Sequence, residues 1–231
     1  MIPLRDENPS LTTPFVTWFL VAANVVVFLV ELGAGSDRAF VSQWAMIPAR
    51  LTLAVRFGDE PITGPAITVL TSMFMHANWL HLLGNMWYLW IFGDNVEDRF
   101  GHFGFLLFYV AAGVVAATLH WATHADARVP TLGASGAIAG VLGAYLVAFP
   151  RARVVTLVPI VIVLRIITLP AVLVLGLWFV FQFLSGALTL GYGSQGGGVA
   201  WWAHIGGFAF GALVMLVASL VRPAPSRAWV E

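Results

Sequence analysis

Long hydrophobic runs, separated by short polar or glycine-rich stretches, dominate this chain. A bilayer core about 30 Å thick requires about 20 apolar residues per transmembrane helix. Five runs have clear limits, at residues 15–32, 103–121, 132–149, 170–190 and 199–221. One more run, second along the chain, ends at Gly93 and begins either near Ile67 or at Asn78, which can cap a helix. We therefore predict an all-α membrane protein, a bundle of six transmembrane helices.

The polar stretches outside these runs suggest how the chain is divided. We expect residues 33–66 to lie at the membrane surface, because they are too polar to span it and too apolar for a free linker. Residues 154–164 are apolar but too short to span. The predicted parts are an N-terminal segment at 1–14, a six-helix domain at 15–221 and a C-terminal tail at 222–231.

Local signals mark two further boundaries. Thr12 or Thr13 can cap the first span, with Pro14 at its first helical position. The glycine-rich stretch 191–198 before the last span predicts a flexible loop.

Composition agrees with a membrane protein and sets its orientation. The chain is 60% hydrophobic and 10% charged, whereas soluble domains are about 45–50% apolar and about 25% charged. Its formal net charge is zero, so a nucleic-acid partner is not indicated. All 11 basic residues are arginine, and more of them fall on the inner side if the N-terminus is cytoplasmic. Without an organelle-targeting segment in the sequence, we expect a bacterial inner membrane.

A serine and a histidine are the polar residues that suggest chemistry inside the membrane. Ser135 lies near the outer end of the fourth span and His204 near the outer end of the sixth. Small residues on both spans allow the two helices to approach closely. The chain has no lysine and no cysteine, so histidine is the available base and serine the available nucleophile. The pattern predicts a Ser135–His204 dyad.

Two residues of the second span can donate hydrogen bonds at the same depth. His81 and Asn85 are four residues apart and therefore share one helix face. With the Ser135 backbone N–H, they could stabilise the oxyanion of an acyl-transfer reaction.

Other enzyme classes find less support in the sequence. The chain has no His-Glu-x-x-His motif for a metalloprotease. The predicted spans carry no acidic residue in their interior, and Glu31 lies at the end of the first. A pair of buried carboxylates, as in aspartic proteases, is therefore not expected. We predict no metal or cofactor, and the sequence does not indicate an oligomeric state.

The motifs around these residues resemble those of rhomboid intramembrane serine proteases. They are Gly133-Ala134-Ser135-Gly136, Ala203-His204 followed by Gly207, and His76, His81 and Asn85 on the second span. The resemblance covers residues 13–221. It implies Ser135 as nucleophile, His204 as general base and acid, and His81, Asn85 and Gly133 at the oxyanion and substrate-binding site. The implied substrates are single-span transmembrane proteins in a lipid bilayer.

The chain departs from some rhomboids at two places. A Trp-Arg pair found in the first loop of some members is absent, and Ala139 stands where some members have a tyrosine beneath the histidine ring. We then expect a neighbouring aromatic side chain to hold the His204 ring. Gln182 is expected to bond a neighbouring helix.

Two alternative functions remain open at this stage. An inactive relative would bind membrane proteins without cutting them, although it would not need both Ser135 and His204. A channel or transporter would more often show buried acids or broken helices.

Overall fold

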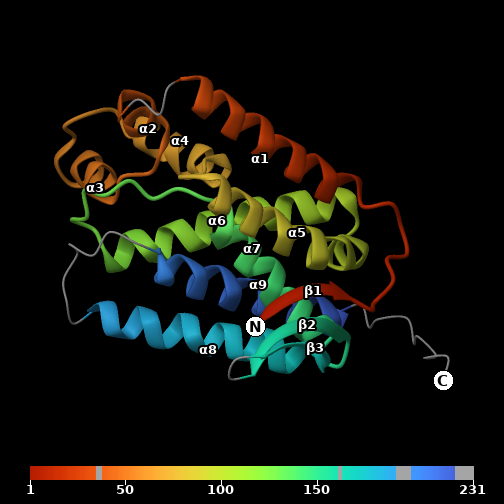
Figure 1. Cartoon of the computed structure of the whole chain (residues 1–231). Helices are drawn as coiled ribbons and strands as arrows, with labels where there is room; N and C mark the ends of the chain where they lie inside the picture. Colours follow the sequence, from red (N-terminus) through yellow and green to blue (C-terminus); the bar gives the residue numbers. More distant parts are fainter. Residues whose placement is uncertain (35–37, 161–162, 191–198, 222–231) are drawn as a thin grey trace.

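Helices make up most of the structure, a computed structural model that describes residues 1–34, 38–160, 163–190 and 199–221 (Figure 1). The long helices are α1 (Phe15–Gly33), α5 (Trp79–Phe100), α6 (His102–Thr123), α7 (Ser135–Ala148), α8 (Ala171–Leu190) and α9 (Trp201–Val221). The shorter ones are α2 (Arg38–Trp44), α3 (Pro48–Phe57), α4 (Thr63–Thr71) and the 3₁₀ turn η1 (Ser72–Phe74). The strands are β1 (Ile2–Asp6), β2 (Arg153–Ile160) and β3 (Val163–Pro170). The predicted loop at 191–198 and tail at 222–231 lie outside the described residues.

Four of the described helices are long and apolar enough to cross a membrane: α1, α6, α9 and the part of α8 up to Leu188. Helix α7 is apolar but has only 14 residues, so it is about 21 Å long. Helix α5 has 22 residues but includes polar and charged ones. Of the six predicted spans, four therefore correspond to helices with the length and composition of a transmembrane helix.

Helix α5 begins where one reading of the sequence placed it and ends later than predicted. The Asn78 side chain caps it by accepting a hydrogen bond from the His81 backbone N–H at 2.9 Å. The predicted end at Gly93 is wrong, because the helix continues to Phe100. Its polar last turns pack inward, with Asn95 and Glu97 fully buried.

A three-stranded antiparallel sheet corrects the all-α prediction. Its strand order is β1-β2-β3, with Ile2 opposite Leu157 and Arg153 opposite Pro170. Residues 154–164, read only as a short apolar stretch, supply most of β2 and the start of β3. Because β1 is five residues long and pairs with a segment far along the chain, no local pattern indicated it.

The first strand is also held by side chains of the helical bundle. The Trp87 indole N–H donates to the Pro3 carbonyl at 2.7 Å, and the Tyr145 hydroxyl donates to the Asp6 carboxyl at 2.6 Å. Burial raises the pKa of Asp6 to about 6, against the opposing effect of the Tyr145 hydrogen bond. The segment at 1–14 is thus part of the folded structure.

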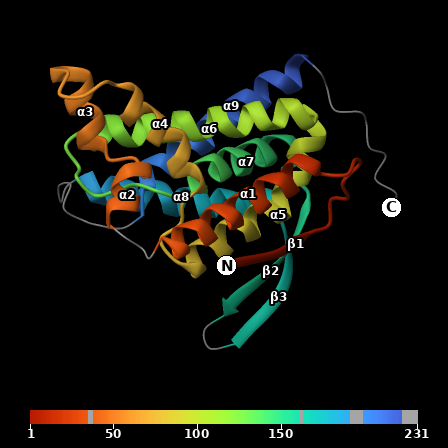
Figure 2. The same ribbon diagram turned by 90° about the horizontal axis from the view of Figure 1, so that it is seen from above.

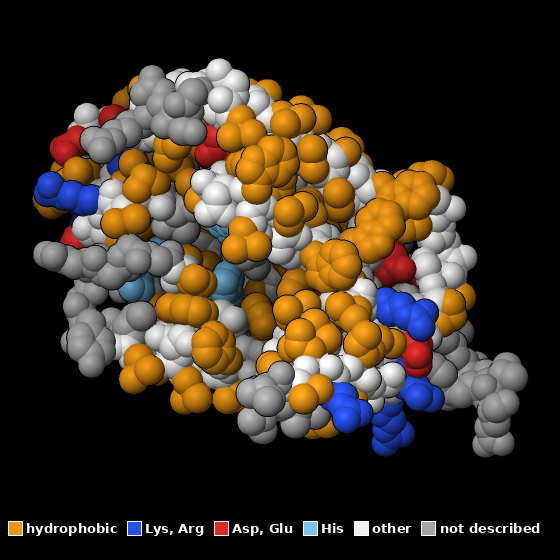
Figure 3. Space-filling model, viewed as in Figure 1, with side chains coloured by type: hydrophobic (Ala, Val, Ile, Leu, Met, Phe, Trp, Pro, Cys, Tyr) orange, Lys and Arg blue, Asp and Glu red, His pale blue; other side chains and the backbone are white. Residues whose placement is uncertain are grey.

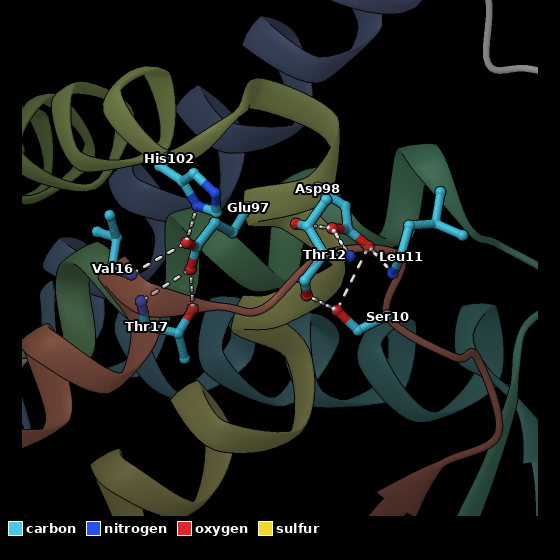
Figure 4. A network of polar contacts seen from close by, with 8 residues as sticks. All are labelled: Ser10, Leu11, Thr12, Val16, Thr17, Glu97, Asp98 and His102. Atoms are coloured by element: carbon cyan, nitrogen blue, oxygen red, sulfur yellow. Dashed lines mark hydrogen bonds and ion pairs between the residues drawn. The ribbon is translucent and has the colours of Figure 1, made fainter.

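The start of α1 is fixed by two acidic residues near the end of α5 (Figure 4). Glu97 accepts hydrogen bonds from the backbone N–H groups of Val16 and Thr17 at 2.9 and 2.8 Å. Asp98 accepts from the Thr12 backbone N–H at 3.0 Å. Glu97 thereby satisfies N–H groups that a helix start leaves without a partner, and Asp98 holds the segment just before the helix. The predicted threonine cap is therefore wrong: Pro14 is the N-cap residue and makes no side-chain cap.

Within the segment predicted at 33–66, the described residues from Arg38 onward form short helices that pack on the α6–α7 connection. The Ala49 N–H donates to the Ala127 carbonyl at 2.9 Å, and the Thr131 N–H donates to the Met46 carbonyl at 2.7 Å. Arg50 of α3 forms an ion pair with Glu60, which lies in the connection between α3 and α4. The connection that leads to Ser135 is thereby braced from one side.

Helix α7 lies in the middle of the bundle (Figures 1 and 2). Every residue from Gly136 to Tyr145 is buried. A Cβ atom at Gly207 would overlap the Gly136 carbonyl oxygen, and one at Gly211 would overlap the Gly140 carbonyl oxygen. Only glycine allows α9 to approach α7 this closely, which confirms that the small-residue faces meet.

Candidate active site

Ser135 and His204 meet where α7 and α9 begin. Ser135 is the first residue of α7, and His204 lies in the first turn of α9. The Ser135 Oγ and His204 Nε2 atoms are 2.7 Å apart, within hydrogen-bond distance. Ser135 is partly exposed and His204 is buried. The hydroxyl can therefore donate to the imidazole while remaining reachable from the pocket.

Gln182 on α8 holds the other side of the His204 ring. Its Oε1 atom lies 2.7 Å from His204 Nδ1, and its side chain is buried. An amide oxygen can only accept, so Nδ1 carries the proton and Nε2 is left as the acceptor for Ser135. This is the protonation state that a general base requires. The expected contact of Gln182 with another helix is present, and its partner is the candidate base itself.

Two tryptophans flank the same ring. The Trp178 ring centroid is 5.9 Å from that of His204 with the planes tilted by 36°. The Trp201 ring approaches edge-on, with its centroid at 6.3 Å. Ala139 has no ring to offer, and the neighbouring aromatic expected in its place is present as Trp178 and Trp201.

His81 and Asn85 face the dyad from α5. Both line the same cavity as Ser135 and His204. Asn85 is buried, and its Nδ2 atom lies 2.9 Å from His76 Nε2. Since Nδ2 carries two protons, one can bind His76 while the other remains for a substrate oxygen.

His76 is itself fixed from α1. Its backbone N–H donates to the Glu31 carboxylate at 3.1 Å, and both side chains are buried. Two carboxylates that the sequence did not predict to be buried, Glu31 and Glu97, lie inside the structure. Each binds backbone N–H groups of a different segment, so they do not form a shared-proton pair.

Gly133 creates room for His81. It has a φ of +126°, and a Cβ atom there would lie 2.8 Å from His81 Nε2. Its own N–H donates to the Ser72 carbonyl at 2.8 Å. Gly133 therefore shapes the site, and its N–H is already used.

A cavity of about 480 Å³ connects these groups. Its walls come from α5, α8 and the starts of α7 and α9, and include Leu80, Tyr88 and Trp178. Figure 3 shows histidine side chains within a hollow bordered by hydrophobic ones. Among the described residues, no cluster of acidic residues or histidines could hold a metal ion.

A comparison with protein families agrees with this arrangement. A family model described as "Rhomboid domain" matches residues 63–220, which is more than half of the chain. The chain belongs to the rhomboid family. The family resemblance drawn from the motifs is therefore confirmed. The long apolar helices of the chain make it an integral membrane protein.

Several named rhomboid proteins share part of the sequence. Rhomboid-like protein 11, chloroplastic, of Arabidopsis thaliana is 44% identical over 71 residues, which are 31% of this chain and 25% of that protein. Presenilin-associated rhomboid-like protein, mitochondrial, of Bos taurus is 31% identical over 136 residues, 58% of this chain and 33% of that protein. Rhomboid protein 1, mitochondrial, of Saccharomyces cerevisiae is 30% identical over 151 residues, 64% and 40% respectively. The chain thus spans less than half the length of these rhomboids.

The sequence predicted that Ser135 and His204 meet and that His81 and Asn85 face them, and the structure places all four around one cavity. It did not identify Gln182 and His76 as their hydrogen-bond partners. His76 was only part of a motif, and Gln182 was assigned to helix packing. The polar character of Gln182 in an otherwise apolar span was the available signal. That signal could not name its partner.

Proposed function

We propose that this rhomboid is an intramembrane serine endopeptidase, which hydrolyses peptide bonds in or near transmembrane segments of other membrane proteins. The observation that carries the proposal is the 2.7 Å contact between Ser135 Oγ and His204 Nε2. A serine hydroxyl becomes a nucleophile when an adjacent base takes its proton. The Gln182 contact on Nδ1 supports the same assignment, since it leaves Nε2 free to be that base.

The proposed reaction has two halves, acylation and deacylation of Ser135, and in each half His204 acts first as a base and then as an acid. His204 Nε2 takes the Ser135 proton as Oγ adds to the substrate carbonyl, and then gives that proton to the leaving amine. The peptide C–N bond breaks and an acyl group remains on Ser135. Water then adds to the ester with His204 again as base, which releases the carboxylic acid and restores the serine hydroxyl.

We assign the oxyanion donors to the start of α7 and to α5. The Ser135 backbone N–H belongs to the first turn of its helix, where N–H groups have no partner within the helix. The Asn85 amide and the His81 ring face the same cavity. Such preorganised donors stabilise the charge that develops on the carbonyl oxygen. Gly133 is not proposed as a donor, because Ser72 already accepts its N–H.

The proposed substrates are single-span transmembrane proteins that enter the cavity from the bilayer. The cavity wall between α5 and α8 is formed by side chains such as Leu80 and Trp178, which suit a lipid-embedded segment. A substrate must expose its carbonyl, so segments weakened by glycine or proline should be preferred. The proposal needs no cofactor. The expected location in a bacterial inner membrane is not part of the proposal, because the relatives described above carry mitochondrial or chloroplastic names.

The deciding experiment is cleavage of a generic single-span substrate by purified wild type, Ser135→Ala and His204→Ala. We expect cleavage by the wild type and its loss in both variants. Cleavage that survives Ser135→Ala would refute the mechanism. A serine-directed fluorophosphonate separates the alternative of a client-binding relative, since failure to label Ser135 in a folded, inactive wild type would favour that alternative.

A further inference from the structure

One face of the sheet is apolar and exposed. Cross-strand partners lie side by side on the same face of an antiparallel sheet. Ile2, Leu157 and Ile166 form one row across the three strands, and Pro159 and Leu164 form the next. Ile2, Leu164 and Ile166 are 53%, 65% and 64% exposed. We call these five residues the apolar sheet face.

Arginines border the apolar sheet face. Arg5 and Arg153 continue it toward the bundle. Arg165 lies on β3 between Leu164 and Ile166, so its side chain projects from the opposite face of the sheet. All three are exposed. Arg153 pairs with Glu7 at 3.2 Å, whereas Arg5 and Arg165 have no ion pair within the part of the chain that the structure describes. In Figure 3 the basic side chains gather at the end of the molecule where Figure 1 shows the sheet.

The base of the sheet is fixed at the ends of two membrane helices. Strand β3 ends at Pro170, and α8 begins at the next residue. The Ala171 N–H donates to the Ala152 carbonyl at 2.8 Å, which ties the start of α8 to the start of β2. Val172 and Leu173, in the first turn of α8, are 46% and 48% exposed. The sheet therefore begins at the level where α8 enters the bilayer.

The sheet extends sideways from that level. Figure 2 shows β2 and β3 projecting away from the bundle, across the direction of the long helices. A sheet that left the membrane would instead continue along the helix direction. Its apolar face is consequently held near the boundary between lipid chains and headgroups.

We propose that the apolar sheet face is a lipid-binding surface for the leaflet in which α8 begins. The apolar rows enter the interfacial zone, while Arg5 and Arg165 contact the phosphate groups of anionic lipids. This combination of buried apolar area and basic side chains is what holds amphipathic elements at anionic membranes. The bilayer also covers β3, which as an exposed apolar edge strand would promote aggregation in water. The proposal does not depend on the proposed protease activity.

The test uses single-cysteine variants. Because the chain contains no cysteine of its own, a thiol-reactive label attaches only at the introduced position. Leu164→Cys carries an environment-sensitive fluorophore, and the protein is reconstituted in nanodiscs of neutral or partly anionic phospholipid. We expect strong quenching by nitroxides on the lipid chains and weak quenching by aqueous iodide. Asp126→Cys, at an exposed position on the α6–α7 connection, should show the reverse. Equal iodide quenching at both positions would overturn the proposal, as would protection from both quenchers, which would indicate a second copy on this face.

The arginine contribution is tested in the same labelled protein. Nitroxide quenching at Leu164→Cys should be about twofold stronger in anionic than in neutral discs, since basic residues are drawn to anionic surfaces. Adding Arg165→Gln should remove most of this difference. Arg56→Gln, an exposed arginine on α3, is the matched control and should leave it unchanged. Identical quenching in both lipids for the unsubstituted sheet would refute the anionic preference.

Discussion

Gln182 determines which nitrogen of the His204 ring carries the proton. A neutral imidazole has one donor and one acceptor nitrogen, and a partner that only accepts must face the donor. The 2.7 Å contact places the Gln182 oxygen at Nδ1, on the side of the ring opposite Ser135. A residue on α8 thus sets the protonation state of the candidate base on α9.

Replacing Gln182 with leucine should therefore lower the turnover number more than it changes substrate binding. The loss of one buried hydrogen bond costs about 1–3 kcal/mol, so we expect kcat to fall by about 5- to 160-fold with KM little changed. Gln182→Glu keeps the acceptor and should recover much of the rate. Measured kcat and KM of both variants decide the matter. An unchanged kcat in Gln182→Leu would show that Gln182 only packs.

The contact between Ser135 and His204 could be predicted from the sequence, whereas the contact of Gln182 with His204 could not. Two polar residues at equal depth, each on a helix with a small-residue face, can meet in few ways. Helix α8 is apolar on all sides, so its sequence does not reveal which face turns toward α9. The same limit applies to His76, whose link to Glu31 depends on how α1 packs.

At the scale of elements, the contact between α7 and α9 fixes the distance between the two candidate catalytic residues. The helix backbones touch at Gly136 and Gly207 and again at Gly140 and Gly211. Any side chain at these points would push α9, and with it His204, away from Ser135.

Gly207→Ala should consequently reduce both stability and activity. Its methyl group would overlap the Gly136 carbonyl oxygen, and overpacking of this kind costs about 1–3 kcal/mol. Gly176→Ala is the matched control, because a Cβ at Gly176 on α8 meets nothing within 4 Å. Thermal midpoints in detergent and cleavage rates should separate the two variants. Equal behaviour would mean that α9 can shift without cost.

The sheet shows what a pattern along the chain cannot supply. Residues 154–164 were recognised as apolar and too short to span, and β-branched residues such as Val154, Val155 and Thr156 favour strands. The pairing with β1 involves residues about 150 positions apart, for which no periodicity gives a sign. Local analysis found the long helices, whereas the sheet depends on tertiary contacts.

At the scale of the whole molecule, α7 separates two ends with different roles. The candidate dyad lies at its first residue, and the sheet with its arginines follows its last turn. A 14-residue helix puts about 21 Å between them. The site therefore lies at one end of the bundle, below the short helices of residues 38–71, and the basic sheet lies at the other.

If α5 and α7 also cross the membrane, these two ends predict on which side of the membrane each connection between helices lies. Cysteines at Ser10, Gly101 and Arg151 should then react with an impermeant maleimide from the side of the N-terminus, and cysteines at Asp59 and Asp126 from the opposite side. All five positions are exposed and lie outside the long helices, so a lack of labelling from one side reports the membrane barrier and not burial. If α5 did not cross, Asp59 and Gly101 would label from the same side, and the six-span bundle would be refuted. Because arginines favour the cytoplasmic side of a membrane, the side that holds the N-terminus should also be the cytoplasmic side, or the matrix side in a mitochondrion. Labelling before and after membrane permeabilisation establishes which side this is.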